Sequence, residues 1–290
     1  MRNKKNVTKP NRRGIRAGWL FLAPSLAGEI IFVLLPFLDV VKRSFTTAVT
    51  GQFSGFSNYK LVFQNEAFRL AAGNTLRFTA VCLPLLIIGS LLLAVMLSRQ
   101  KYVRLLKSCF LFPMAVPAAT VALVWKMLFE RAGLLSSALL SLGMQPVDWM
   151  NTGMAFWVLV VSYLWKNTGY TIILWLAGIM SIPDTLLEAA RADGAGEWKC
   201  FTKIMLPNLK PMLYTITVLS FLNSFKVFRE AYLVAGGYPD GSMYLLQHLF
   251  NNWFTNMEFD KMAAAAVVIA GILYLAVTLL QKLWEQEEAA

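Results

Sequence analysis

The decisive polar segment of this chain reads Ser181-Ile-Pro-Asp-Thr-Leu-Leu-Glu-Ala-Ala-Arg-Ala-Asp-Gly-Ala-Gly-Glu-Trp-Lys-Cys-Phe-Thr-Lys-Ile-Met-Leu-Pro-Asn-Leu-Lys-Pro211. Its charged side chains before Lys210 are Asp184, Glu188, Arg191, Asp193, Glu197, Lys199 and Lys203. A segment with this charge cannot lie in hydrocarbon, although apolar stretches flank it on both sides. The pattern predicts two short amphipathic helices separated at Gly194, because a glycine after a periodic run commonly ends a helix.

Both predicted helices carry apolar stripes that need a surface to pack on. Trp198, Phe201 and Met205 fall on one face of the second helix, and its charged residues fall mostly on the other. Helices this short are marginally stable alone. The stripes are therefore expected to pack on the membrane domain of the same chain or on a soluble partner.

The segment resembles a motif of ABC-importer permeases, E-A-A-x3-G-x9-I-x-L-P. The matching residues are Glu188, Ala189, Ala190, Gly194, Ile204, Leu206 and Pro207. The resemblance implies a cytoplasmic loop that docks into a groove of a separate ATP-hydrolysing subunit. The alternative is a solvated amphipathic linker between two membrane spans.

The resemblance also implies roles for individual residues of the motif. Glu188 would face a basic residue of the ATPase, and Gly194 would form a turn where the two backbones approach closely. Ala189 and Ala190 would be helix-packing positions. Asp193 would either touch the partner or stay solvated.

Composition places the chain among polytopic membrane proteins. It has 290 residues, of which 57% are hydrophobic, and a mean hydropathy of +0.55. The net charge of +11 is expected to set the orientation in the membrane rather than to bind nucleic acid. The three cysteines and the single histidine show no metal-ligand spacing, so we expect neither a metal site nor a disulfide.

We expect an all-α fold with six membrane-spanning helices within residues 19–283. The expected spans are about 19–41, 74–97, 108–129, 153–182, 208–235 and 262–283. The polar run from Lys166 to Gly169 is expected to interrupt the fourth span. A basic tail (1–18) and an acidic tail (284–290) lie outside the membrane domain, and the polar loop (about 181–211) lies within it.

Positive charge predicts the orientation of these spans. Lys and Arg are more frequent on the side that holds both tails and the 181–211 loop than on the other side. The positive-inside rule therefore places both termini and this loop in the cytoplasm. The expected location is the bacterial plasma membrane, with lipid around the spans.

Further segments resemble carbohydrate-importer permeases of the maltose and glycerol-3-phosphate branch. They are Trp19–Leu26, Gly55–Lys60, Asn74–Leu76, Gly178–Pro183 and Val234–Gly237. The resemblance implies a type I ABC importer fold and a sugar as the solute. It implies three kinds of partner: ABC ATPase subunits, a second homologous permease chain and an extracytoplasmic solute-binding protein.

ATP is expected to be bound by the partner ATPase, because this chain has no G-x-x-x-x-G-K-[ST] phosphate loop. The chain has no nucleophile–base set, so we expect neither an enzyme nor a cofactor. A secondary transporter driven by an ion gradient is the alternative from another class, and a membrane-embedded enzyme is a weaker one.

Polar residues at membrane depth are candidates for the substrate pathway. They are Lys166, Asn167, Asn223, Lys226 and Arg229. Asn223, Lys226 and Glu230 would share one face of a continuous helix, where a Lys226–Glu230 pair is the structural alternative. The two cations of this region favour an anionic sugar as an alternative solute. Lys126 and Glu130 are expected to reach the interface or to pair.

Overall fold

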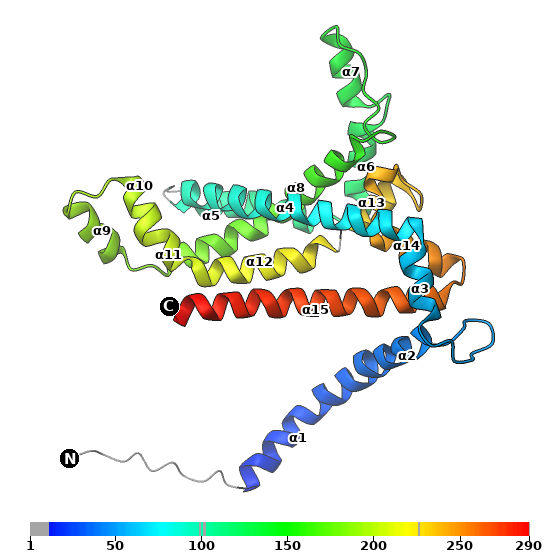
Figure 1. Ribbon diagram of the computed structural model, residues 1–290. Coiled ribbons are helices and arrows are strands. Elements are labelled where there is room, and N and C mark those ends of the chain that lie inside the picture. The colour runs from blue at the N-terminus through cyan, green and yellow to red at the C-terminus, as the bar shows by residue number, and fades with distance from the viewer. Residues whose placement is uncertain (1–11, 99, 101–102, 226, 290) are drawn as a thin grey trace. The chain divides into compact units, whose positions relative to one another are not determined.

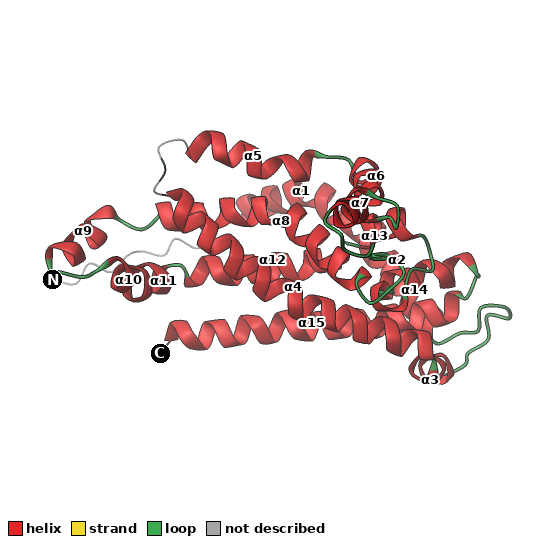
Figure 2. Ribbon diagram, turned by 90° about the horizontal axis from the view of Figure 1, so that it is seen from above, coloured by secondary structure: helices red, strands yellow, loops and turns green. Residues whose placement is uncertain are grey.

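The computed structural model describes residues 12–98, 100, 103–225 and 227–289. Over these residues the chain is helical, with one isolated antiparallel bridge between Thr46 and Phe53 (Figures 1 and 2). The predicted all-α class is therefore confirmed. The described chain forms two compact units, one of residues 12–62 with 257–271 and a larger one of residues 63–256 with 272–289.

The helices of the smaller unit are α1 (Arg12–Glu29), the π-helical η1 (Ile30–Leu34), α2 (Leu35–Ser44), most of α3 (Ser57–Gln64) and the first part of α15 (Phe259–Ala289). The larger unit contains α4 (Glu66–Ser98), α5 (Val103–Ala115), α6 (Ala118–Phe129), α7 (Leu134–Ser141), α8 (Ala155–Met180), α9 (Asp184–Ala192), α10 (Glu197–Cys200), η2 (Phe201–Met205), α11 (Leu206–Asn208), α12 (Lys210–Ser224), α13 (Phe228–Ala235), η3 (Gly241–Met243) and α14 (Leu246–Thr255).

Three described helical stretches are long and apolar enough to cross a membrane. They comprise residues 19–44, 66–98 and 259–282. Two bent pairs also qualify, residues 107–115 with 118–141 and residues 155–180 with 184–192. The structure therefore contains three to five candidate spans by length and composition, and the count of six remains a prediction.

The third and fifth expected spans are not single straight helices. The third bends by 95° between α5 and the helical stretch that begins at Ala118. Pro117 accounts for this bend, because a proline disfavours helical geometry at the residue before it. The fifth divides into α12 and α13, so the single helical face expected for Asn223 and its neighbours is wrong.

The fourth expected span is an uninterrupted helix, so the expected break at Lys166 to Gly169 is also wrong. Asn167 Nδ2 donates to the Tyr163 carbonyl at 2.8 Å, and Thr168 Oγ1 donates to the Leu164 carbonyl at 2.6 Å. Backbone carbonyls one turn earlier in the same helix accept the hydrogen bonds of these polar side chains. The run therefore places polar groups on α8 without ending it.

Helix α8 is the central packing element of the larger unit, against α4, α5 and α12. One core cluster joins Phe78 and Leu86 of α4 to Phe156 and Tyr163 of α8. A second cluster, nearer the polar loop, surrounds Trp175, which is fully buried. This packing fixes the two structures that concern function, the polar loop and the polar groups of α8.

The segment Gly55–Tyr59 ties α3 to the end of α2 in the smaller unit. Asn58 is buried, and its side-chain amide donates to the carbonyls of Ser44 (3.1 Å) and Thr46 (2.9 Å). Tyr59 and Ser44 join their hydroxyls at 2.7 Å. This segment therefore fixes the turn that follows α2.

Candidate functional site

The polar loop forms the predicted helix–turn–helix. Helix α9 carries Glu188, Ala189 and Ala190, and the turn to α10 follows at Asp193 and Gly194 (Figure 1). Glu188, Ala189, Asp193 and Gly194 are exposed, and Ala190 is half-buried. The loop thus presents a carboxylate and a turn to its surroundings.

The spacing of the alanines and the glycine is that of a Schellman helix end. The Ala195 N–H donates to the Ala190 carbonyl at 2.9 Å, and the Gly194 N–H donates to the Arg191 carbonyl at 3.0 Å. Gly194 has a φ of +79°, which residues with a Cβ adopt only with strain. A Cβ at this position would meet no atom within 4 Å, so lack of space does not explain the glycine. The positive φ is what requires it.

One ion pair links the two arms of the loop. Arg191 Nε lies 3.0 Å from Glu197 Oε1, and this hydrogen bond raises the pKa of the Arg191 guanidinium. Both side chains are exposed, so the pair adds little stability and mainly restrains the angle between α9 and α10. Arg191 and Glu197 therefore pair with each other within the loop.

The base of the loop is buried and its tip is exposed. Ile182, Met205 and Leu209 belong to the core cluster around Trp175. Trp198, by contrast, is 75% exposed, and Leu186 is 46% exposed. The expected apolar stripe therefore divides. Met205 packs on the membrane domain, whereas Trp198 is left exposed for another surface.

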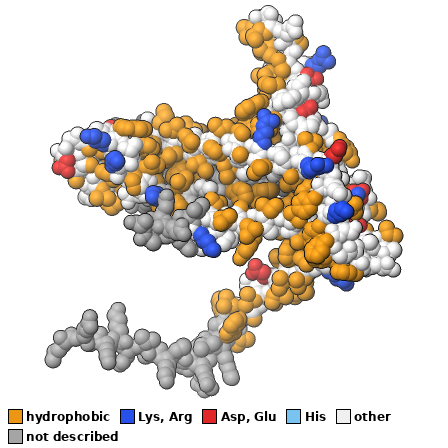
Figure 3. Space-filling view, in the orientation of Figure 1, with side chains coloured by type: hydrophobic (Ala, Val, Ile, Leu, Met, Phe, Trp, Pro, Cys, Tyr) orange, Lys and Arg blue, Asp and Glu red, His pale blue; other side chains and the backbone are white. Residues whose placement is uncertain are grey.

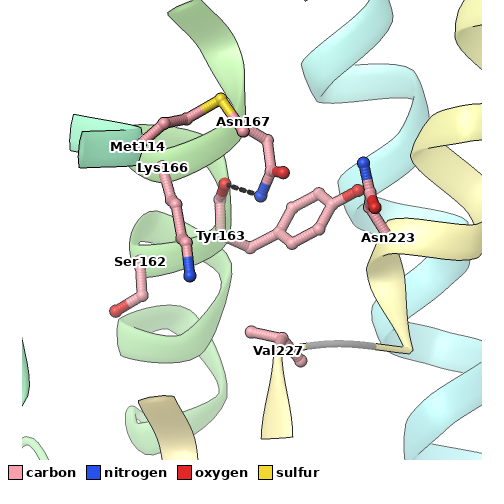
Figure 4. A pocket seen from close by; sticks show the side chains of 7 residues that line it. All are labelled: Met114, Ser162, Tyr163, Lys166, Asn167, Asn223 and Val227. Atoms are coloured by element: carbon pink, nitrogen blue, oxygen red, sulfur yellow. Dashed lines mark hydrogen bonds between the residues drawn. The ribbon is translucent and has the colours of Figure 1, made fainter. Parts of the chain in front are cut away.

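A central cavity of about 210 Å³ lies between α5, α8 and the α12–α13 region (Figure 4). Its lining residues are Met114, Ser162, Tyr163, Lys166, Asn167, Asn223 and Val227. The structure therefore brings together three of the five predicted pathway residues, Lys166, Asn167 and Asn223.

Tyr163 is the residue that orders this cavity. Its ring extends from α8 toward Asn223 of α12, as Figure 4 shows, and its hydroxyl donates to the Ser220 carbonyl at 2.8 Å. Its backbone carbonyl also accepts the Asn167 amide. Tyr163 thereby connects α8 to α12 beside the polar groups.

The remaining predicted pathway residues are placed differently. Arg229 is exposed on α13 and does not line the central cavity. Lys226 lies outside the described residues. The sequence reasoning missed Ser162 and Tyr163, although each stands four residues before a predicted residue, Lys166 or Asn167. Residues four positions apart lie on the same face of a helix, so this spacing was the signal that could have found them.

The surface of the larger unit is divided by type of side chain. In the view of Figure 3, hydrophobic side chains dominate between its two ends, and most charged side chains gather at those ends. One charged end is the α9–α10 loop, and the other lies near α6 and α13. This distribution suits a helix bundle that lies in lipid with its ends in water.

A helix bundle with an apolar belt and a protruding polar loop is typical of a protein embedded in a membrane. The family model for the binding-protein-dependent transport system inner membrane component matches residues 86–287. The chain therefore belongs to this family, whose members are permease subunits and not enzymes.

Relatives match over nearly the whole length of the chain. An arabinooligosaccharide transport permease of Bacillus subtilis is 33% identical over 91% of this chain and 87% of its own. A trehalose/maltose transport permease of Thermococcus litoralis is 31% identical over 94% of this chain and 95% of its own. Both agree with the carbohydrate-importer resemblance.

A solved structure has the same fold. It is a bacterial ABC transporter involved in the import of the acidic polysaccharide alginate. Its matching chain has a TM-score of 0.84 at 23% identity and covers 94% of this chain and 98% of its own. The chain therefore has the type I ABC importer permease fold.

Proposed function

We propose that this chain forms half of the translocation pathway of an ATP-driven importer for a sugar or oligosaccharide. The similarity to sugar-transport permeases along the whole chain is the observation that carries this proposal. An extracytoplasmic binding protein delivers the sugar, and separate ATPase subunits supply the energy. A second, homologous permease chain completes the pathway.

The α9–α10 loop is the coupling element of this proposal. Glu188 offers an exposed carboxylate, and the exposed Trp198 and Leu186 offer apolar area. A charge together with an apolar anchor suits docking in a groove of a partner subunit. The buried base at Ile182 and Leu209 transmits movement of the loop to α8 and α12.

The central cavity is the proposed solute site. Lys166, Asn167 and Asn223 supply donors and acceptors for sugar hydroxyls at membrane depth, where polar groups are costly without a role. Arg229 and Lys226 remain candidates for the part of the pathway that the second permease chain completes.

The topology of the proposal has six spans within residues 19–283. The basic tail (1–18), the coupling loop (about 181–211) and the acidic tail (284–290) lie in the cytoplasm. The distribution of Lys and Arg supports this orientation. The membrane is the bacterial inner membrane.

A pull-down of the tagged chain in mild detergent tests the coupling loop. Glu188→Lys is expected to lose most of the ATPase that wild type recovers, because charge reversal at an interface replaces attraction by repulsion. The matched control is Glu66→Lys, which reverses another exposed carboxylate on α4, away from the loop.

Two outcomes would contradict this part of the proposal. Equal ATPase recovery by Glu188→Lys and Glu66→Lys would remove Glu188 from the interface. Wild type that recovers no ATPase, and whose vesicles take up solute on an ion gradient alone, would mean a secondary transporter.

Uptake by the assembled importer in vesicles identifies the solute class. The panel is maltose, trehalose, lactose and arabinotriose, each assayed with ATP and with an uncoupler. Uptake that needs ATP and survives the uncoupler is expected for at least one of them. If none is taken up, the neutral-sugar assignment is wrong, and if a uronate trisaccharide is not taken up either, the sugar assignment as a whole is wrong.

An anionic sugar is the second candidate solute. The described lining of the central cavity includes a cation, Lys166. Such a site favours a carboxylated or phosphorylated ring. A competition assay decides between the two by following uptake of the transported solute. An anionic solute predicts that a uronate trisaccharide inhibits this uptake and that the neutral panel sugars do not.

A further inference from the structure

A second cavity lies at the end of α8 that is remote from the coupling loop; we call it the distal cavity. Its volume is about 460 Å³, within the usual range of about 300–1,000 Å³ for small-molecule sites. Its lining residues are Lys126, Glu130, Arg131, Met150, Asn151, Val234, Ala235, Tyr238, Pro239 and Asp240. They come from α6 and the turn after it, from the segment before α8, and from the end of α13 with the segment after it.

The distal cavity is separate from the central cavity, and a third, narrow space adjoins both. A space of only about 10 Å³ lies between them, and it shares Val234 with the distal cavity and Ser162 with the central one. Trp125, Leu159 and Met243 narrow this space. The two larger cavities are therefore two neighbouring sites and not two ends of one open site.

The constriction includes Trp125, whose side chain carries a polar N–H group. Its side chain is 8% exposed, and its indole N–H has no acceptor among the described residues. A buried donor without a partner is costly, and a passing hydroxyl group would satisfy it. Because Trp125 lines the narrow space, a solute that moves from one cavity to the other would pass its side chain.

The chemistry of the distal cavity matches a neutral sugar. Tyr238 is 76% exposed at the lining, so its ring offers a flat apolar face together with a hydroxyl. Lys126 and Arg131 are balanced by Glu130 and Asp240, which gives donors and acceptors for hydroxyl groups without a net charge.

Two of the polar side chains are held in place before any ligand binds. Asp240 Oδ1 accepts from Ser242 N (2.9 Å) and Ser242 Oγ (2.6 Å). The Asn151 amide donates to both carboxylate oxygens of Asp148, at 3.1 and 3.2 Å. Such fixed groups reduce the entropy that a ligand loses on binding.

From this geometry we propose that the distal cavity is an outer sugar-binding site, closed from the central cavity by Trp125. It holds a sugar ring against Tyr238 after the binding protein releases it and before the constriction opens. This inference rests on the proposed function and adds a second site for the same solute.

Cysteine protection in the assembled importer tests the outer site. The background is Cys109→Ser, because Cys109 is exposed whereas Cys82 and Cys200 are buried. Ala235→Cys, a lining position that keeps the Tyr238 ring in place, is labelled with a maleimide in the presence and absence of the panel sugar that supports uptake. Labelling is expected to slow about twofold when the sugar concentration equals its dissociation constant.

The matched control is Leu142→Cys, a position that is 75% exposed and outside the cavity lining. Its labelling rate is expected to be the same with and without sugar. A companion uptake assay compares Tyr238→Phe, which keeps the ring, with Tyr238→Ala. The phenylalanine variant should retain the wild-type KM and the alanine variant should raise it.

The outcomes separate the two proposals. If sugar uptake is intact but sugar never protects Ala235→Cys, the outer site is wrong and the importer assignment stands. If sugar slows labelling at Leu142→Cys as much as at Ala235→Cys, protection is a global change and the outer site is also wrong. If neither a panel sugar nor the uronate trisaccharide is taken up, the sugar-importer assignment fails and the outer site fails with it.

Discussion

His248 is the only histidine of the chain, and it is completely buried. Its Nδ1 accepts the Leu245 N–H at 3.2 Å, at the start of α14. Phe228 packs edge-on against the imidazole at 4.9 Å between ring centroids, and Tyr244 stacks on it. His248 is therefore a packing residue, and burial lowers its pKa from 6.5 to about 4.

Acid is expected to destabilise the chain through His248. Between about pH 6.5 and pH 4 the unfolded chain binds a proton at this residue and the folded chain does not. The free energy of unfolding therefore falls as the pH drops through this window, by at most about 3 kcal/mol, and is unaffected above it. Thermal unfolding in detergent as a function of pH measures this slope.

The variant His248→Asn isolates the histidine in this experiment. Asparagine keeps an acceptor for the Leu245 N–H and does not titrate. The variant should flatten the pH dependence between pH 6.5 and 4. An equal slope in wild type and variant would assign the acid sensitivity to other groups.

At the scale of elements, Gly169 sets the distance between α5 and α8. A Cβ at this position would overlap the Phe110 carbonyl of α5. Gly169→Ala is expected to destabilise the chain by about 1–3 kcal/mol, because a backbone contact cannot move aside as a side chain does. The expected readout is a lower thermal unfolding midpoint in detergent.

The control for this prediction is Gly89→Ala. Gly89 lies within α4, and a Cβ there meets nothing within 4 Å. Alanine stabilises a helix interior relative to glycine, so the control should unfold at the same temperature as wild type or slightly higher. Equal destabilisation by both variants would contradict the close α5–α8 contact.

Several elements were foreseeable and others were not. The α9–Gly194–α10 turn was predicted, because its glycine and its amphipathic pattern act within one short segment. The break between Ser224 and Phe228 was not, because the sequence there contains neither proline nor glycine. Helices α7 and α14 lie in segments expected to be loops.

For the whole molecule, topology is the property to test. A cysteine at Leu142 is expected to react with an impermeant maleimide added to intact cells, because its segment lies outside in the proposed orientation. A cysteine at Trp198, which is also exposed, should react only after the membrane is permeabilised. These measurements use the same Cys109→Ser background.

The reverse pattern would invert the orientation and remove the coupling loop from the cytoplasm. Labelling of both positions from outside would contradict the number of spans between them. Either result would overturn the proposed contact with an ATPase, because ATP is hydrolysed in the cytoplasm.

Composition and local sequence patterns were enough to predict the membrane class, the helical fold and the family. Hydrophobic composition, the spacing of the Glu188–Pro207 motif and the bias of positive charge are local or additive properties, which can be read without coordinates. Lys166, Asn167 and Asn223 were also found this way, because polar residues in apolar segments stand out.

Which polar residues share a cavity depends on how the helices pack. Asn223 and Tyr163 line one cavity because α12 packs on α8, and Tyr238 and Lys126 line the other because α13 packs on α6. Such meetings depend on packing between residues far apart in sequence, where no local pattern carries the information. The distal cavity and its constriction at Trp125 therefore came from the fold alone.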